Sequence, residues 1–61
     1  MKFLEVITDS GSEWLNINHI IYIKEVILPN RIIRTRISTE QYHWDDIRQI
    51  EDVLIALENL K

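Results

Sequence analysis

The sequence predicts an α+β fold: a small, strongly bent antiparallel sheet of about five strands, SH3-like or roll-like, followed by one C-terminal amphipathic helix. Isoleucine is the commonest residue, with twelve copies against a single alanine, and β-branched side chains favour strands. Residues 2–44 alternate between apolar and polar side chains and are broken by turn-forming residues, which is typical of a β-meander. Residues 45–60 instead repeat apolar side chains at the spacing of a helix.

A hairpin is expected at the start of the chain. Residues 2–8 alternate loosely between apolar and polar side chains, and residues 13–18 alternate cleanly. Gly11, the only glycine, lies between them in a segment of small polar residues and predicts a turn. The two segments are therefore predicted to pair as the first two strands.

Residues 20–28 predict a third strand that is apolar on both faces. Ile21, Ile23 and Ile27 share one face, and Ile20, Tyr22 and Val26 share the other. We expect such a strand to be covered twice, by the core on one side and by a helix or a second subunit on the other. Pro29 ends the strand, because proline has no N–H to donate to a ladder.

Residues 31–37 predict a fourth strand, in which Ile33, Thr35 and Ile37 share one face and Ile32, Arg34 and Arg36 share the other. Residues 38–41 predict a turn, and residues 42–44 predict a short fifth strand. An alternative interpretation starts the helix at Ser38, with Gln41 completing a capping box. We favour the strand, because Tyr, His and Trp are poor helix formers.

The helix is expected over residues 45–60. Asp45 is a suitable N-cap, and Asp46 complements the helix dipole. Arg48 is spaced to pair with Asp45 and Asp52. The acids Asp45, Asp46 and Asp52 are therefore interpreted as helix charge on a solvated face. The apolar face consists of Ile47, Ile50, Val53, Leu54, Leu57 and Leu60. Ile55 falls on the polar side, where it is either a stray exposed residue or a contact with a partner.

Length and composition restrict the class of protein. The 61 residues form one domain, and the absence of cysteine excludes disulfides and thiolate zinc sites. A core of this size rarely supplies more than roughly 3–5 kcal/mol, so association is the expected supplement. No apolar run is long enough to span a membrane. Glu5 interrupts any signal-peptide pattern, and we expect a cytoplasmic protein.

No enzyme is predicted. The serines lie in expected turns, and His19 and His43 match no catalytic or metal-binding pattern. A single glycine excludes the glycine-rich phosphate loops. We therefore expect no catalytic residue, no metal and no cofactor.

Two surfaces are candidates for binding. The first is surplus apolar surface, a candidate protein interface made of Ile20, Tyr22, Val26, Ile32 and Ile55. The second is a basic strip in a chain whose net charge is −3. Its arginines, with nearby aromatic side chains, are suited to phosphates and stacked bases; this candidate nucleic-acid patch consists of Arg31, Arg34, Arg36, Trp14 and Trp44. An edge strand protected by charge is the alternative for the arginines.

The segment 16–25, with the sequence NINHIIYIKE, and the turn Thr8-Asp9-Ser10-Gly11 before it resemble the small flagellar FlbD/SwrD-like family. That resemblance implies a β-meander followed by a C-terminal helix. The family usually has a glycine in the second hairpin turn, where this chain has Ser38-Thr39-Glu40-Gln41.

The same segment, continued through residues 46–54, is similar to the first half of a LytTR-type DNA-binding domain. The second half, with the basic recognition segment, has no counterpart here, so this likeness implies shape rather than DNA binding. The predicted form, five strands and a helix, is also similar to the dimeric CsrA-like RNA-binding proteins.

The sequence favours a non-enzymatic regulatory or adaptor module that acts through protein–protein contacts as a homo-oligomer. A nucleic-acid-binding regulator that uses the arginine strand is the second hypothesis. A phage- or plasmid-encoded inhibitor of a host protein is the third.

Overall fold

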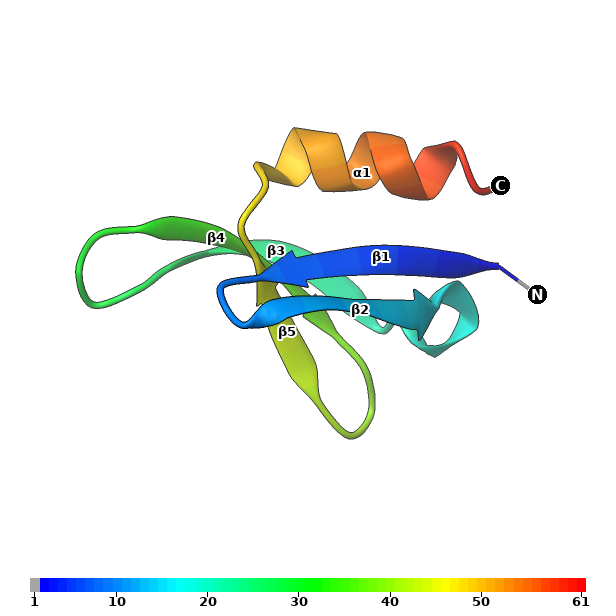
Figure 1. The fold of residues 1–61 in the computed structure, drawn as a ribbon, viewed down its shortest axis with the longest axis horizontal. Helices are drawn as coiled ribbons and strands as arrows, with labels where there is room; N and C mark the ends of the chain where they lie inside the picture. Colours follow the sequence, from blue (N-terminus) through cyan, green and yellow to red (C-terminus); the bar gives the residue numbers. More distant parts are fainter. Residues whose placement is uncertain (1) are drawn as a thin grey trace.

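The computed structural model describes residues 2–61, which form five antiparallel strands and a C-terminal helix (Figure 1). The elements in chain order are β1 (Phe3–Thr8), β2 (Gly11–Asn16), the short 3-10 helix η1 (Ile17–His19), β3 (Tyr22–Ile27), β4 (Ile33–Ser38), β5 (His43–Asp46) and α1 (Ile50–Glu58). The predicted α+β class is confirmed. The strands divide between two sheets, β1–β2 and β3–β4–β5, rather than forming one.

The strand faces follow the alternation of the sequence. Leu4, Val6 and Leu15 point inward from the first hairpin, and Ile37 points inward from β4. Val53 of α1 closes the core, and it is fully buried, as Ile37 is. Ile17, Ile20, Ile23, Trp44, Ala56 and Leu60 pack around these five side chains. The core is therefore small and lies between the two sheets and the helix.

Several predicted strand ends are wrong. The second strand stops at Asn16, because its side chain accepts a hydrogen bond from the backbone N–H of Asn18 and turns the chain into η1. The third strand consequently begins at Tyr22 instead of residue 20. The fourth begins at Ile33 instead of residue 31, since Arg31 adopts a left-handed φ of 62° inside the turn.

The segment 38–44 is a turn and a strand, as favoured. The turn closes through Thr39, whose N–H donates to the carbonyl oxygen of Tyr42 at 2.8 Å. The fifth strand then covers His43–Asp46, longer than the predicted residues 42–44. An earlier helix start is excluded by this pairing, in which Trp44 lies opposite Ile37.

The predicted start of the helix is wrong. Asp45 and Asp46 belong to β5, and α1 begins only at Ile50, with Gln49 as an N-cap that makes no side-chain hydrogen bond. The helix ends at Glu58 instead of residue 60. Two residues expected on its buried face, Ile47 and Leu54, are largely exposed.

The β3–β4 hairpin extends beyond the helix that packs over it. Figure 1 shows α1 lying over one side of the strands, while the closed end of this hairpin extends past the start of the helix. The molecule is accordingly elongated, with extents of 36 × 24 × 20 Å. The part of the chain that the structure describes has no helix long and apolar enough to cross a membrane.

Candidate interaction surface

The structure does not gather the candidate protein interface into one surface. Tyr22 and Val26 share the outer face of β3, as expected. Ile20 instead packs against the core. Ile32 lies at the end of the β3–β4 hairpin, and Ile55 lies on the outer side of α1, 58% exposed. The five residues therefore occupy separate places.

The arginines of the candidate nucleic-acid patch are partly neutralised by carboxylates. Arg36 donates to Asp45, its register partner on β5, through two hydrogen bonds of 2.8 and 3.2 Å. This pair lowers the pKa of Asp45 and raises the pKa of Arg36, the hydrogen bond being the main cause in both. A guanidinium nitrogen of Arg34 lies 3.5 Å from a carboxylate oxygen of Asp9 in the β1–β2 turn. Phosphate groups would have to compete with these acids for both arginines.

Of the two tryptophans of the same candidate patch, only Trp44 lines a depression together with an arginine, Arg34. Trp14 lies on the outer face of the β1–β2 hairpin, opposite Glu5, and is 67% exposed. Trp44 lies on the inner face of β5, where its indole N–H donates to Glu13 of β2. The edge of the Tyr42 ring contacts Trp44, with 5.0 Å between ring centroids. The structure thus separates the two tryptophans.

A depression of about 540 Å³ lies between the β1–β2 turn and β5. Its lining includes Arg34, Tyr42 and Trp44, together with Asp9 and Asp45. Arg34 and Asp9 pair with each other, and Asp45 pairs with Arg36. Glu13 also lines the depression and accepts the indole N–H of Trp44, which leaves its charge unneutralised, so the depression combines aromatic surface with a net negative charge.

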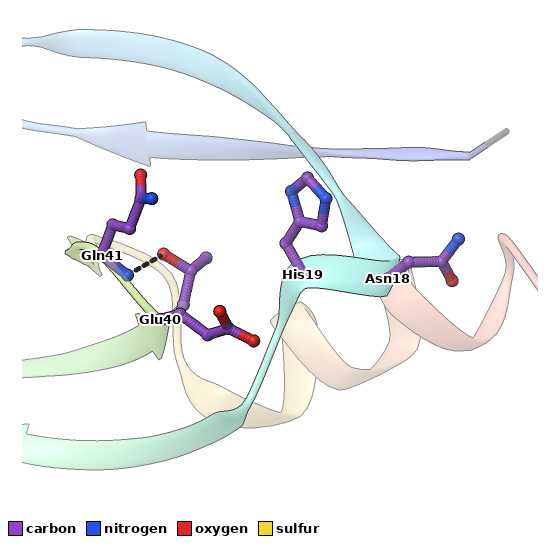
Figure 2. Close-up of a pocket in the computed structure, with 5 residues that line it drawn as sticks. Asn18, His19, Glu40 and Gln41 are labelled. Atoms are coloured by element: carbon purple, nitrogen blue, oxygen red, sulfur yellow. Dashed lines mark hydrogen bonds between the residues drawn. The ribbon is translucent and has the colours of Figure 1, made fainter.

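A smaller depression of about 360 Å³ separates η1 from the β4–β5 turn (Figure 2). Asn18 and His19 line it from η1, and Thr39, Glu40 and Gln41 line it from the turn. Among the described residues, no three His, Cys, Asp or Glu side chains come together as a metal site. His19 and Glu40 alone provide too few ligands for a metal ion.

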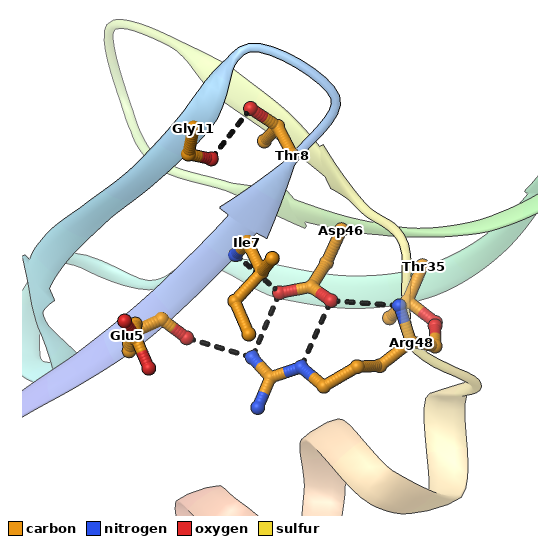
Figure 3. A network of polar contacts seen from close by, with 7 residues as sticks. All are labelled: Glu5, Ile7, Thr8, Gly11, Thr35, Asp46 and Arg48. Carbon is orange, nitrogen blue, oxygen red and sulfur yellow. Dashed lines mark hydrogen bonds and ion pairs between the residues drawn. The ribbon is translucent and has the colours of Figure 1, made fainter.

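Asp46, which the sequence predicts to be a solvated helix charge, is buried. Asp46 is 0% exposed and joins β1, β5 and the start of the helix (Figure 3). Its carboxylate accepts hydrogen bonds from the backbone N–H groups of Ile7 and Arg48 at 2.9 and 2.8 Å. The Arg48 guanidinium donates to both carboxylate oxygens, at 2.9 and 2.8 Å. The predicted pairing of Arg48 with Asp45 and Asp52 is therefore wrong.

The charged groups of Asp46 and Arg48, which we call the Asp46–Arg48 junction, are paired with each other and with backbone groups. Burial alone raises the pKa of the Asp46 carboxyl, but the hydrogen bonds from Arg48 and from the Ile7 N–H outweigh burial and hold the pKa below its usual value. Arg48 also donates to the carbonyl oxygen of Glu5 at 2.7 Å, and its own carbonyl accepts from the Thr35 hydroxyl at 2.9 Å. All of these partners are internal, so the junction is structural rather than a binding site.

An exposed apolar pair on the three-stranded sheet was not predicted. Ile27 and Ile33 face each other on β3 and β4 and are 73% and 57% exposed, although both share the face of Ile37. Ile21, expected to be covered as well, is 59% exposed. Within a single copy, the third strand is therefore not covered on both sides, and cover by a second subunit stays a prediction. The alternation identified the face correctly but carried no information on how far the helix reaches.

Comparison with known proteins gives no match: no protein-family model, no curated protein and no solved structure matches the chain.

Proposed function

We propose that the chain is a non-enzymatic regulatory or adaptor module that acts through protein–protein contacts as a homodimer. The observation that carries this proposal is the imbalance between core and surface. Five hydrophobic side chains of the described residues are buried, whereas eleven large apolar side chains are 36% or more exposed. Where such side chains adjoin one another, as Ile27 and Ile33 do, exposed apolar surface marks an interaction site.

The exposed area supports the same proposal. The chain has an accessible surface of 4503 Å², whereas a compact monomer of 7.4 kDa is expected to expose about 4200 Å². Association would remove part of this excess from water, and each Å² of apolar surface removed contributes roughly 25 cal/mol. A partner subunit would thus supplement a core that is small even for this length.

Binding of nucleic acid is less well supported. Phosphate contacts dominate the affinity of proteins for nucleic acids, and Arg34 and Arg36 already pair with Asp9 and Asp45. The net charge of −3 adds a general repulsion. Protein contact is the function that these features favour.

Sedimentation equilibrium from nanomolar to high micromolar concentration tests the proposal. We expect a dimer at micromolar concentration that dissociates on dilution, with a melting temperature that falls as the concentration falls. A folded monomer at every concentration, with one unchanging melting temperature, would contradict the proposed function.

A further inference from the structure

The closed end of the β3–β4 hairpin is apolar and uncovered. We define the hairpin tip as Ile27, Arg31, Ile32 and Ile33, all of which are exposed. Ile27 and Ile33 form the next pair on the same face of the sheet after Glu25 and Thr35. The Thr35 hydroxyl donates to the Arg48 carbonyl, just before α1 begins, so the helix reaches the Thr35 pair and leaves the tip pair exposed.

The tip also carries a positive charge. Arg31 lies in the turn with a left-handed φ of 62° and is exposed. The ion pairs found among the described residues are those of Arg34, Arg36, Arg48 and Lys61, so Arg31 takes no part in them. A surface that covers the tip would therefore have to be apolar and acidic.

The outer side of α1 has this composition. Glu51, Leu54, Ile55 and Glu58 follow the spacing i, i+3, i+4, i+7, which places them on one face of a helix. We call this face the helix stripe. All four side chains are exposed, with Leu54 at 46% and Ile55 at 58%, and the stripe faces away from the buried Val53. The helix thus has two faces, one packed against its own core and one exposed. On the exposed face a carboxylate oxygen of Glu58 lies 3.6 Å from the Lys61 ammonium, whereas Glu51 takes part in none of the ion pairs found among the described residues.

We propose that the hairpin tip of one copy docks on the helix stripe of a second copy. Ile27 and Ile33 would pack against Leu54 and Ile55 of the second copy, and Arg31 would lie between the two glutamates of the stripe. In a two-fold dimer each copy presents both surfaces, so the contact occurs twice and the assembly closes. This inference rests on the proposed function and specifies its interface.

The area required is consistent with two such contacts. A specific interface buries about 800 Å² on each partner, so each tip and each stripe would supply roughly 400 Å². That lies within the roughly 300–600 Å² typical of the largest apolar patch on a small protein. The tip cannot reach the stripe of its own chain, because the hairpin extends past the start of α1 (Figure 1).

Pairing of two copies through the free edge of β3 is the other way to form a dimer. The middle of this edge carries Lys24 and Glu25. A symmetric antiparallel pairing centred there would place Lys24 against Lys24 or Glu25 against Glu25. Like charges opposite each other are destabilising, and charged residues at an edge discourage such pairing. The hairpin tip and the helix stripe attract each other instead, since their charges are complementary.

The dissociation constants of charge-reversal variants of the full chain, measured by sedimentation equilibrium, test this interface. R31E alone should raise the dimer dissociation constant about three- to tenfold, because it reverses the tip charge in both contacts. E51R combined with E58R should raise it similarly. A chain that carries all three changes should recover most of the affinity, because the reversed charges are again complementary.

A second pair of variants tests the apolar part. I27T with I33T keeps β-branched side chains on the strands, and we expect a dissociation constant at least about tenfold higher. Y22T is the matched control on β3, since Tyr22 is 43% exposed but lies on the opposite face, and it should leave the dissociation constant unchanged. Circular dichroism confirms that each variant is folded.

The outcomes separate the two proposals. Loss of affinity in R31E and in the E51R/E58R variant, with recovery in the triple variant, supports the interface. A wild-type dimer that these variants leave unchanged, or a triple variant weaker than either parent, overturns the interface but not the proposed function. A wild-type chain that is monomeric at all concentrations overturns both.

Discussion

The inner face of β4 has two parts that differ in exposure. Ile37 and Thr35 at the base of the hairpin are fully buried, whereas Ile33 at its end is 57% exposed. All three side chains point the same way, and two of them are isoleucine. The difference comes from the position of the helix, which begins beside Thr35. Burial in so small a protein is therefore set by the reach of the covering element, and the strand sequence does not determine it.

The Asp46–Arg48 junction fixes the position of α1 over the strands. Removing it should therefore cause the largest loss of stability. D46N leaves the guanidinium of Arg48 without its carboxylate, and breaking a buried pair in this way costs about 3–5 kcal/mol. This is comparable to the whole stability of such a core. Urea unfolding at pH 7 measures the loss, with an osmolyte added to both proteins if the variant is unfolded without it.

The same variant should respond differently to pH. Because folding lowers the pKa of Asp46, its contribution is complete above the unfolded value of about 3.9 and is lost as the pH falls through the lower folded value. The gap in stability between wild type and D46N should therefore be full at pH 6 and shrink below about pH 4. D45N is the matched control on the exposed side of β5 and should cost much less at neutral pH. A gap that stays constant down to pH 2 would contradict the role given to Asp46.

Matched truncations in β4 compare the two parts of the hairpin directly. I37V should lower the free energy of unfolding by about 0.5–1.5 kcal/mol, because it removes a methylene group from the core. I33V should change it by less than about 0.5 kcal/mol, because that side chain is exposed in a single copy. Both are measured by urea unfolding at concentrations below the dimer dissociation constant. Equal losses would show that the tip is covered within the single chain.

The smallest effect is expected from the paired arginines on the outer face. R34A combined with R36A should leave binding to a short single-stranded oligonucleotide undetectable at low salt, as for the wild type, because their charges are balanced by Asp9 and Asp45. Fluorescence anisotropy measures this. Salt-sensitive binding by the wild type that the double variant abolishes would favour the nucleic-acid hypothesis instead.

The sequence predicted the faces of the strands better than their surroundings. Alternation placed Ile33, Thr35 and Ile37 together and separated them from Arg34 and Arg36, as the register confirms. Alternation is a local property set by the pleat, so it can be read from one segment.

The junction and the tip could not be predicted in the same way. Asp45 and Asp46 precede an amphipathic segment and have the appearance of helix caps, but the burial of Asp46 depends on Ile7 and Glu5, about forty residues earlier in the chain. Leu54 fits the helical period of the buried face, yet it is 46% exposed. Only the position of α1 over β3 and β4 shows that it belongs to the helix stripe.

The most direct test of the account is a dilution series followed by NMR of isoleucine and leucine methyl groups. We predict that the signals of Ile27, Ile33 and Leu54 shift together as the dimer dissociates, while the signal of the buried Ile37 stays in place. Methyl signals of Ile27 and Ile33 that do not depend on concentration, in a sample that sedimentation shows to be dissociating, would contradict the claim that a second copy covers the hairpin tip.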